Sequence, residues 1–208
     1  MRLDAINIHK RYDRKPVFQG ISLSLTVSES LAVTGSNGSG KSTLMKILAG
    51  LSAPTLGSVT MTLFDKSLEK TERFRYIGFV APYLQFYEEL TGLENIVFSL
   101  RAKNVTPEMS RLNQLFEHFA LHAAKEKPVK MYSSGMAQRL RFIQALAAQP
   151  KFLFLDEPTV TLDQNGIAQL WSILDELRSN VVLIIASNDA RDVGQCQRTL
   201  SIEDYKNS

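Results

Sequence analysis

Glycines, a lysine and hydroxyl side chains follow one another in a single short run of the sequence. The run is Gly35-Ser36-Asn37-Gly38-Ser39-Gly40-Lys41-Ser42-Thr43, which has the spacing of a phosphate-binding loop. Glycines let the backbone curl so that successive N–H groups point at one anion, and a helix that begins near Lys41 adds its unpaired N–H groups. We therefore predict that the run binds nucleotide phosphates. Lys41 is expected to reach the β- and γ-phosphates, and the Ser42 hydroxyl to bind Mg²⁺.

Two adjacent carboxylates, Asp156 and Glu157, follow the apolar segment Phe152–Leu155. The segment has the length of a buried strand, and open α/β sheets bind their ligands at the carboxyl ends of strands. We predict that Asp156 holds Mg²⁺ and that Glu157 orients or deprotonates an attacking water. A strand that simply meets a turn often ends in the same way. The phosphate loop in the same chain favours the catalytic interpretation.

The elements that must position these groups alternate between strand and helix. Strands are expected at Leu3–Lys10, Ile21–Val27, Leu31–Thr34, Val59–Phe64, Tyr76–Val80, Phe152–Leu155 and Val181–Ile185. Helices are expected at Lys41–Ala49, where Gly50 ends the helix, along the apolar stripe that runs from Met136 to Ala147, and over Ile167–Leu177. This order predicts an α/β fold with a mainly parallel sheet flanked by helices, after an antiparallel β part at the N-terminus.

The middle of the chain contains no strand pattern. Thr91 and Glu94 have the spacing of a capping box that opens one helix, and Ser110–Ala120 suggests another. We therefore predict a single domain over residues 1–208, with a core of about 1–80 and 134–208 and a helical lobe of about 81–133.

Composition places the chain among ordinary globular proteins. Of its 208 residues 44% are hydrophobic and 22% charged, and the net charge is +3. The basic residues are scattered, so no nucleic-acid partner is expected. A lone cysteine, Cys196, fits a reducing compartment. The polar N-terminus and the absence of a long apolar run predict a cytoplasmic protein that meets a membrane only through a partner.

With these motifs in place, the sequence resembles the ATP-binding subunits of ABC transporters over nearly its whole length. The run Tyr132-Ser133-Ser134-Gly135-Met136 is similar to the LSGGQ signature of that family. Tyr12 lies where the family has an aromatic that stacks on adenine, although by itself it would be an ordinary packing aromatic. The segment Thr161-Leu162-Asp163 resembles the loop through which two subunits touch. Ser133 alone would be an ordinary helix cap.

The resemblance implies a P-loop NTPase core, ATP and Mg²⁺ as cofactors, and Mg²⁺-dependent ATP hydrolysis. It also implies that Ser133 and the N–H of Gly135 donate to the γ-phosphate of ATP held by another subunit. The expected partners are therefore a second copy or a related ATPase chain, together with a membrane-spanning permease subunit. The protein would lie on the inner face of the cell membrane through that partner.

Two positions depart from the family pattern. The family usually has Gln at the end of the strand before the lobe, where this chain has Ala81-Pro82, with Gln85 three residues later. The family usually has a catalytic His after the strand Val181–Ile185, and here Asn188 takes that place. An Asn side chain can donate a hydrogen bond to a phosphate but cannot carry charge. Ala81-Pro82 together with residues 89–95 resembles the short haem-exporter ATP-binding subunits of cytochrome c maturation.

Two other classes of protein remain open from the sequence. One is a soluble ABC-type ATPase in iron–sulfur assembly, translation or DNA repair. The other is an ATP-gated interaction module that hydrolyses ATP weakly, which the presence of Asn188 would favour.

Overall fold

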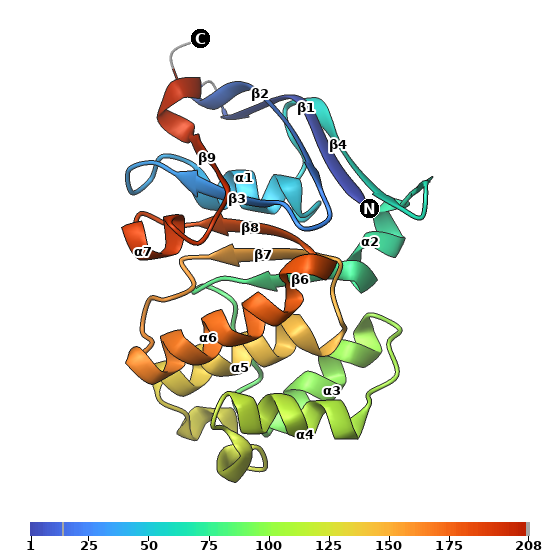
Figure 1. The fold of residues 1–208 in the computed structure, drawn as a ribbon, viewed down its shortest axis with the longest axis vertical. Coiled ribbons are helices and arrows are strands. Elements are labelled where there is room, and N and C mark those ends of the chain that lie inside the picture. The colour runs from blue at the N-terminus through green and yellow to red at the C-terminus, as the bar shows by residue number, and fades with distance from the viewer. Residues whose placement is uncertain (14, 207–208) are drawn as a thin grey trace.

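Two β-sheets form the frame of the molecule (Figure 1). The computed structural model describes residues 1–13 and 15–206, so Arg14 and residues 207–208 of the predicted domain lie outside the described residues. An antiparallel four-stranded sheet has the order β2-β1-β4-β5, and a parallel five-stranded sheet has the order β6-β7-β8-β3-β9. The strands are β1 (Arg2–Tyr12), β2 (Lys15–Thr26), β3 (Ser30–Thr34), β4 (Leu56–Leu63), β5 (Lys66–Ser67), β6 (Ile77–Val80), β7 (Phe152–Asp156), β8 (Val182–Ala186) and β9 (Arg198–Ser201).

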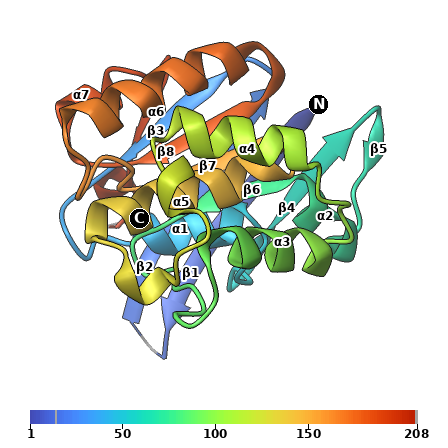
Figure 2. The same cartoon turned by 90° about the horizontal axis from the view of Figure 1, so that it is seen from below.

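Helices cover the parallel sheet, and in Figures 1 and 2 α5 and α6 run side by side with α3 and α4 beyond them. The α-helices are α1 (Lys41–Leu48), α2 (Lys70–Tyr76), α3 (Gly92–Ala102), α4 (Met109–His118), α5 (Ser134–Ala147), α6 (Gln164–Leu177) and α7 (Ala190–Val193). Short 3₁₀ turns span His122–Ala124, Val129–Met131, Arg178–Asn180 and Ile202–Tyr205. None of the helices in the described part of the chain is long and apolar enough to cross a membrane.

Alternate residues of β7 face two separate hydrophobic cores. Phe152 and Phe154 pack in the core that α1 and the antiparallel sheet complete. Leu153 and Leu155 pack in the core that α3, α4, α5 and α6 complete. Successive side chains of a strand point to opposite faces, so Asp156 continues the side of Phe152 and Phe154. The strand itself therefore directs this carboxylate toward α1.

Parallel pairing brings the carboxyl ends of four strands to one edge of the sheet. Val33 of β3 and Asp156 of β7 both pair with Ala186 of β8, and Val80 of β6 pairs with Leu155. The loops after these strands therefore leave the sheet at the same edge. They contain the phosphate run, Glu157, Asn188 and the connection to α3, and Asp156 is the last residue of β7 at this edge.

The chain between β6 and α5 is helical. Thr91 caps α3: its hydroxyl accepts a hydrogen bond from the Glu94 N–H at 3.1 Å, while the Glu94 carboxylate accepts one from the Thr91 N–H at 2.8 Å. The ring of Phe119 stacks on Phe142 of α5 with centroids 5.7 Å apart. The predicted capping box and α/β fold class are confirmed, whereas the division of the chain into core and lobe stays a prediction.

Two α-helices, α2 and α7, and two strands, β5 and β9, were not predicted from the sequence. Helix α2 has no buried residue, so its sequence carries no apolar periodicity, and Tyr76, predicted to start a strand, ends this helix instead. Helix α7 spans only four residues. Strand β9 buries only Leu200, too little to produce an alternating pattern.

Candidate active site

The phosphate run forms the tight connection between β3 and α1. Gly40 has a φ of 112°, and a Cβ there would lie 2.5 Å from Cγ1 of Val17. Both facts require glycine, because a side chain would be strained and would collide with β2. No side chain of the described residues caps the first turn of α1. The first N–H groups of the helix therefore remain available to an anion, as the sequence predicted.

Lys41 lies at the floor of the cavity that this loop encloses. The cavity measures about 360 Å³ and is lined by residues 37–43 and Glu157. The Lys41 side chain is buried, with 6% of its surface exposed. Its Nζ donates a hydrogen bond to the Gly35 carbonyl at 2.7 Å and lies 3.7 Å from Oε1 of Glu157. The ammonium is thus held in place without a close carboxylate partner and can turn toward a phosphate.

Asp156 is a buried carboxylate, and neither of its oxygens has a hydrogen-bond partner among the described residues. Burial raises the pKa of this group, and the neighbouring Ser42 hydroxyl and Lys41 ammonium oppose the shift. Carboxylate and hydroxyl oxygens are the ligands that Mg²⁺ prefers, and Mg²⁺ normally keeps several waters besides one or two protein ligands. Asp156 and Ser42 therefore fit the predicted metal.

Glu157 follows directly and lies at the edge of the same cavity. Its backbone is left-handed, with a φ of 49°, and its N–H donates to the Ala186 carbonyl at 2.8 Å. Burial raises the pKa of the Glu157 carboxyl, Lys41 opposes this shift, and the charges of Asp156 and Asp192 add to it. A carboxylate with a raised pKa that faces the phosphate cavity suits a group that must accept a proton from water.

Asn188 contacts the phosphate loop at two points. Its Oδ1 accepts a hydrogen bond from the Gly35 N–H at 3.4 Å, and its Nδ2 donates to Oδ1 of Asn37 at 3.3 Å. Both bonds are long, so they hold the side chain only weakly. The loop after β8 thus brings Asn188 to the phosphate loop, and its catalytic role stays a prediction.

Ser133 and Gly135 lie outside the cavity lining of the same chain. Ser133 caps α5 by accepting a hydrogen bond from the Met136 N–H at 3.2 Å. A Cβ on Gly135 would lie 3.2 Å from the Thr161 carbonyl. Arg139 of the same helix donates to Asp163 at 2.6 Å. The structure therefore brings together the signature-like run and residues 161–163, and it leaves both apart from their own phosphate loop.

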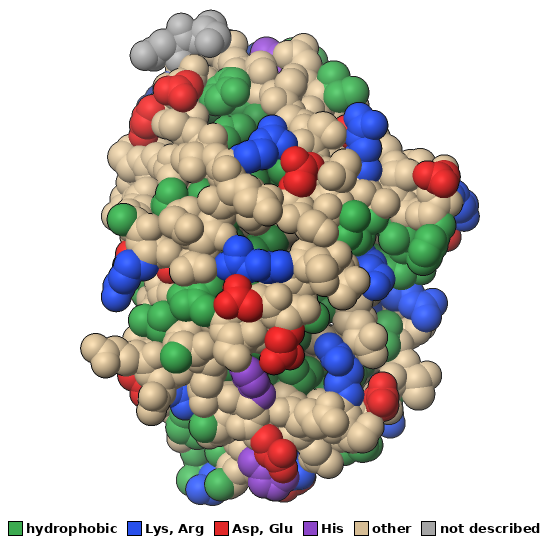
Figure 3. All heavy atoms as spheres, viewed as in Figure 1, with side chains coloured by type: hydrophobic (Ala, Val, Ile, Leu, Met, Phe, Trp, Pro, Cys, Tyr) green, Lys and Arg blue, Asp and Glu red, His purple; other side chains and the backbone are tan. Residues whose placement is uncertain are grey.

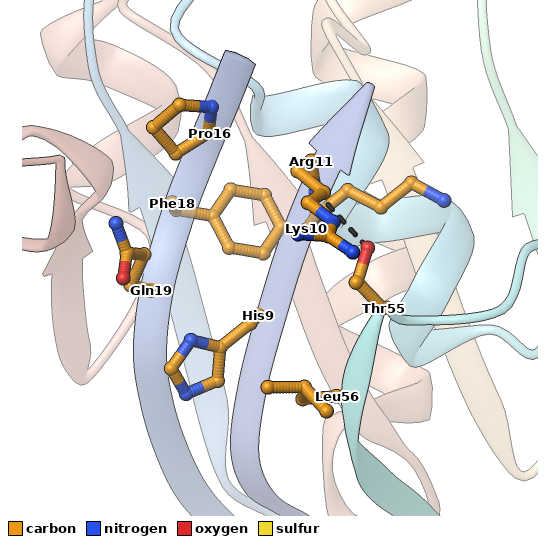
Figure 4. Close-up of a pocket in the computed structure, with 8 residues that line it drawn as sticks. All are labelled: His9, Lys10, Arg11, Pro16, Phe18, Gln19, Thr55 and Leu56. Carbon is orange, nitrogen blue, oxygen red and sulfur yellow. Dashed lines mark hydrogen bonds between the residues drawn. The ribbon is translucent and has the colours of Figure 1, made fainter. Parts of the chain in front are cut away.

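Tyr12 lies at the end of β1, with 55% of its surface exposed. Nζ of Lys10 lies over its ring, 4.9 Å from the centroid. The preceding residues of β1 line a pocket with Phe18 of β2 and with Thr55 and Leu56 at the start of β4 (Figure 4). Because Phe18 and Val17 of β2 also approach Gly40, this hairpin lies against the phosphate loop. The role of Tyr12 in stacking on adenine stays a prediction.

Two acidic residues near the site were not identified from the sequence. Glu203 accepts hydrogen bonds from the Ser36 N–H at 3.0 Å and the Ser36 hydroxyl at 2.6 Å. Hydrogen bonding, first from Lys206, lowers the pKa of Glu203 to about 2. Asp192 is buried and accepts hydrogen bonds from Ser187 at 2.8 Å and Thr159 at 2.9 Å. No local signal marks either residue as part of the site, because Ser36 lies 167 positions from Glu203 and Thr159 lies 33 positions from Asp192.

We expect Asp156→Asn to stabilise the protein without nucleotide at pH 7. A raised pKa in the folded state means that the ionised carboxylate opposes folding, and that the lost stability returns when the pH falls below the ordinary pKa of Asp. Removing a buried charge without a hydrogen-bond partner should raise the free energy of unfolding by about 1 kcal/mol or more. Urea denaturation at several pH values measures this, and the gain should shrink as the medium becomes acidic.

Asp65→Asn is the matched control, because Asp65 lies exposed in the turn between β4 and β5. It should leave the free energy of unfolding unchanged within about 0.5 kcal/mol. If Asp156→Asn were destabilising at pH 7, the carboxylate would have a stabilising partner that the geometry does not reveal.

Comparison with known proteins shows the family to which the chain belongs. The sequence model of the ABC transporter family matches residues 18–160. The chain is 34% identical over 211 residues to the lipoprotein-releasing system ATP-binding protein LolD of Hydrogenovibrio crunogenus, covering 94% of this chain and 91% of that protein. It is 32% identical over 188 residues to the uncharacterized ABC transporter ATP-binding protein YxlF of Bacillus subtilis, covering 89% of this chain and 62% of that protein. It spans 64% of the length of YdbJ, another uncharacterized ABC transporter ATP-binding protein of Bacillus subtilis. The chain therefore spans less than two thirds of the length of both Bacillus proteins.

Solved structures give the same fold. A dimeric ATP-binding cassette in a post-hydrolysis state, bound to ADP and Pi, superposes with a TM-score of 0.86 at 23% identity, over 96% of this chain and 93% of that one. The segment that matches the family's sequence model, residues 18–160, contains the phosphate loop, the signature-like run and both carboxylates. The chain therefore belongs to the ATP-binding proteins of the ABC transporter family.

Proposed function

We propose that this protein is the ATP-binding and ATP-hydrolysing motor subunit of an ABC-type transporter whose membrane-spanning subunit is a separate chain. One observation carries the enzymatic part. Lys41 and Glu157 face the same cavity, which the N-terminus of α1 lines, and the Asp156 carboxylate beside it has no hydrogen-bond partner within the described chain. This arrangement has a cation for the phosphates, a base for water and a carboxylate that could hold a metal.

In this mechanism the backbone N–H groups of the loop and Lys41 hold the β- and γ-phosphates. Bound Mg²⁺, held by Ser42 and Asp156, would neutralise charge on the phosphate oxygens. Glu157 accepts the proton of the attacking water, and the backbone bond to β8 fixes where its side chain begins. Asn188 donates its amide hydrogen toward the phosphate once it leaves Asn37.

A second subunit completes the site. Ser133 and Gly135 lie outside the cavity of their own chain but carry an exposed hydroxyl and the first N–H groups of α5. Donors of this type stabilise a γ-phosphate when they approach it from outside. A second copy, or a related chain, that faces this one would bring Ser133 over the ATP of its partner. ATP would then hold the two together until hydrolysis.

The surface between α2 and α3 supports a membrane-spanning partner. Phe74 and Phe98 are both about half exposed, and Tyr87 meets Phe98 edge-on with centroids 5.2 Å apart. A hollow of about 300 Å³ separates the helices and is lined by Phe74, Ser99 and Lys103 among others. Figure 3 shows Lys and Arg side chains among hydrophobic ones along the right-hand edge, over α2. Exposed aromatics beside a hollow are typical of protein interfaces.

Several finer expectations stay predictions. These are a cytoplasmic location on the inner face of the membrane, the absence of a nucleic-acid partner, and the likeness to haem-exporter subunits. Proteins with similar sequences include lipoprotein-releasing and sulfate/thiosulfate import ATP-binding proteins. We therefore assign neither a direction of transport nor a substrate.

We expect Glu157→Gln to keep ATP binding, to lower turnover by at least about a hundredfold and to trap an ATP-bound dimer. Glutamine is nearly the same size and can still bond to water, but it cannot accept the proton. Losing the charge also reduces repulsion toward the γ-phosphate. Light scattering with Mg-ATP, beside a steady-state hydrolysis assay, measures both effects.

Lys41→Ala is the control for this experiment, because it should lose nucleotide affinity and therefore stay monomeric with ATP. A monomer under all conditions, in Glu157→Gln as well as the wild type, would contradict the shared-site mechanism while leaving the phosphate site intact.

We expect Asn188→His to raise ATP turnover several-fold. A protonated imidazole can stabilise charge that develops on the phosphate, and Asn188 is exposed and held only by long hydrogen bonds. A gain of about 1 kcal/mol at the transition state corresponds to about fivefold in rate. Hydrolysis rates at saturating Mg-ATP decide this. An equal or lower rate would mean that the site is built around the amide of Asn188.

We expect Phe98→Ser to weaken the association with the membrane subunit but not the hydrolysis of ATP by the isolated protein. The tagged protein is purified from detergent-solubilised membranes, and proteins with several predicted spans are identified by mass spectrometry. Ile6→Ser, which alters an even more exposed apolar residue on the antiparallel sheet, should retain the partner. Equal recovery with both variants would rule out the surface between α2 and α3.

A further inference from the structure

The chain after β9 forms the 3₁₀ turn Ile202–Tyr205, which we name the β9 turn. Thr34 and Ser201 pair with each other as the last residues of the parallel strands β3 and β9, so the phosphate loop and the β9 turn leave the sheet side by side. The turn also lies beside β2 (Figure 1). Ile202 is fully buried, and a Cβ on Gly35 would lie 3.4 Å from the Ile202 Cβ. The β9 turn is therefore packed against the first residue of the phosphate loop.

Glu203 of the β9 turn holds Ser36, the second residue of the phosphate loop. Its Oε1 accepts hydrogen bonds from the Ser36 N–H at 3.0 Å and from the Ser36 hydroxyl at 2.6 Å. The Ser36 carbonyl accepts a third hydrogen bond, from the Ser39 N–H at 3.0 Å. By comparison, the hydrogen bond from the Gly35 N–H to Asn188 is long, at 3.4 Å. Glu203 therefore makes the stronger of these two side-chain contacts with the start of the loop.

The negative charge of Glu203 is balanced, although a carboxylate beside an anion-binding loop would ordinarily repel phosphate. Nζ of Lys206 lies 2.8 Å from Oε2 of Glu203, which is the oxygen that does not bond to Ser36. Neither Ser36 nor Glu203 is among the described residues that line the phosphate cavity. The carboxylate therefore acts on the loop through hydrogen bonds to Ser36, and not as a charge that faces the ligand.

We propose that Glu203 is a positioning residue that orders the phosphate loop before nucleotide binds. Gly38 and Gly40 of the loop have positive φ angles, and glycine loses more conformational freedom on ordering than any other residue. Gly38 is exposed, and a Cβ there would meet no atom of the described chain within 4 Å. Packing therefore does not hold the middle of the loop. Fixing Ser36 reduces the freedom that a bound phosphate must otherwise remove, and this reduction favours binding.

The effect of Glu203 should appear in nucleotide binding and not in turnover. Once the loop and Lys41 hold the phosphates, the ligand itself keeps the loop ordered in the ground state and in the transition state alike. An interaction that favours both states equally changes KM without changing kcat. The inference rests on the nucleotide site of the proposed function, but it requires neither a second subunit nor a membrane partner. It can therefore be tested on the isolated chain.

Calorimetric titration of the isolated chain with Mg-ADP tests the proposal. We expect Glu203→Ala to lower the affinity about fivefold, which corresponds to the net value of one hydrogen bond, with unchanged stoichiometry. Glu203→Gln keeps an oxygen that can accept both hydrogen bonds, so it should retain the affinity within about twofold. If Glu203→Ala does not fold, Ser36→Ala takes its place and should lower the affinity about threefold, because it removes the hydroxyl donor and keeps the N–H.

Two further measurements separate ordering of the loop from general damage to the protein. Without nucleotide, the amides of residues 36–40 should exchange with deuterium faster in Glu203→Ala than in the wild type, and with Mg-ADP bound the two rates should be equal. ATP hydrolysis at saturating Mg-ATP should stay within about twofold of the wild type while KM rises. A variant that was merely damaged would instead bind at reduced stoichiometry and lose maximal rate.

Asp204→Ala is the matched control, because Asp204 is an exposed carboxylate of the same turn and does not bond to Ser36. It should keep the affinity within about twofold. Unchanged affinity or unchanged exchange in Glu203→Ala would overturn the proposal. So would an equal loss of affinity in Glu203→Gln, because the charge and not the hydrogen bonds would then matter. A wild type that does not bind Mg-ADP would instead refute the proposed nucleotide site, and this inference with it.

Discussion

The buried carboxylate of Asp156 is the constraint around which the site is organised. An ionised group without a partner is costly inside a protein, and the cost falls only when a cation or a hydrogen-bond donor arrives. Here the carboxylate ends a strand whose other inward residues, Phe152 and Phe154, are packed in the core. The sheet therefore holds Asp156 in place whether or not a partner is present. Lys41 and Lys46 lie near enough to offset part of the cost without closing the site.

The phosphate loop presents positive charge, whereas Asp156 presents negative charge, so the loop and the carboxylate complement each other. Its N–H groups and Lys41 present positive charge to a cavity whose acidic lining residue is Glu157. Lys41 bonds meanwhile to the Gly35 carbonyl, a neutral partner that a phosphate can readily replace. A magnesium–nucleotide complex brings an anion to the loop and a cation to Asp156 at the same moment. Binding therefore relieves both imbalances, which explains why a cationic loop and a buried carboxylate can stand side by side in one site.

What the sequence could predict depends on how far apart the partners lie along the chain. The phosphate loop, the carboxylate pair and the Thr91 cap are local patterns, and the structure has them where the residues indicated. The contact of Glu203 with Ser36 joins residues 167 positions apart, and that of Lys46 with Tyr83 joins α1, which packs on β7 and β8, to the connection after β6. Neither contact produces a periodic pattern in the sequence. Helix α2 was not predicted for a related reason, because a helix without buried residues has no apolar stripe in its sequence.

The two hydrophobic cores meet along strand β7. This strand gives Phe152 and Phe154 to one core and Leu153 and Leu155 to the other. Close-packed interiors have low compressibility and transmit strain, so β7 couples the two cores rather than separating them. The connection after β6 adds direct contacts at the carboxyl edge of the sheet, because Lys46 of α1 lies over the Tyr83 ring and Arg141 of α5 donates to the Leu84 carbonyl. The side chains around the phosphate site are therefore joined to α5 both through the core and across this edge.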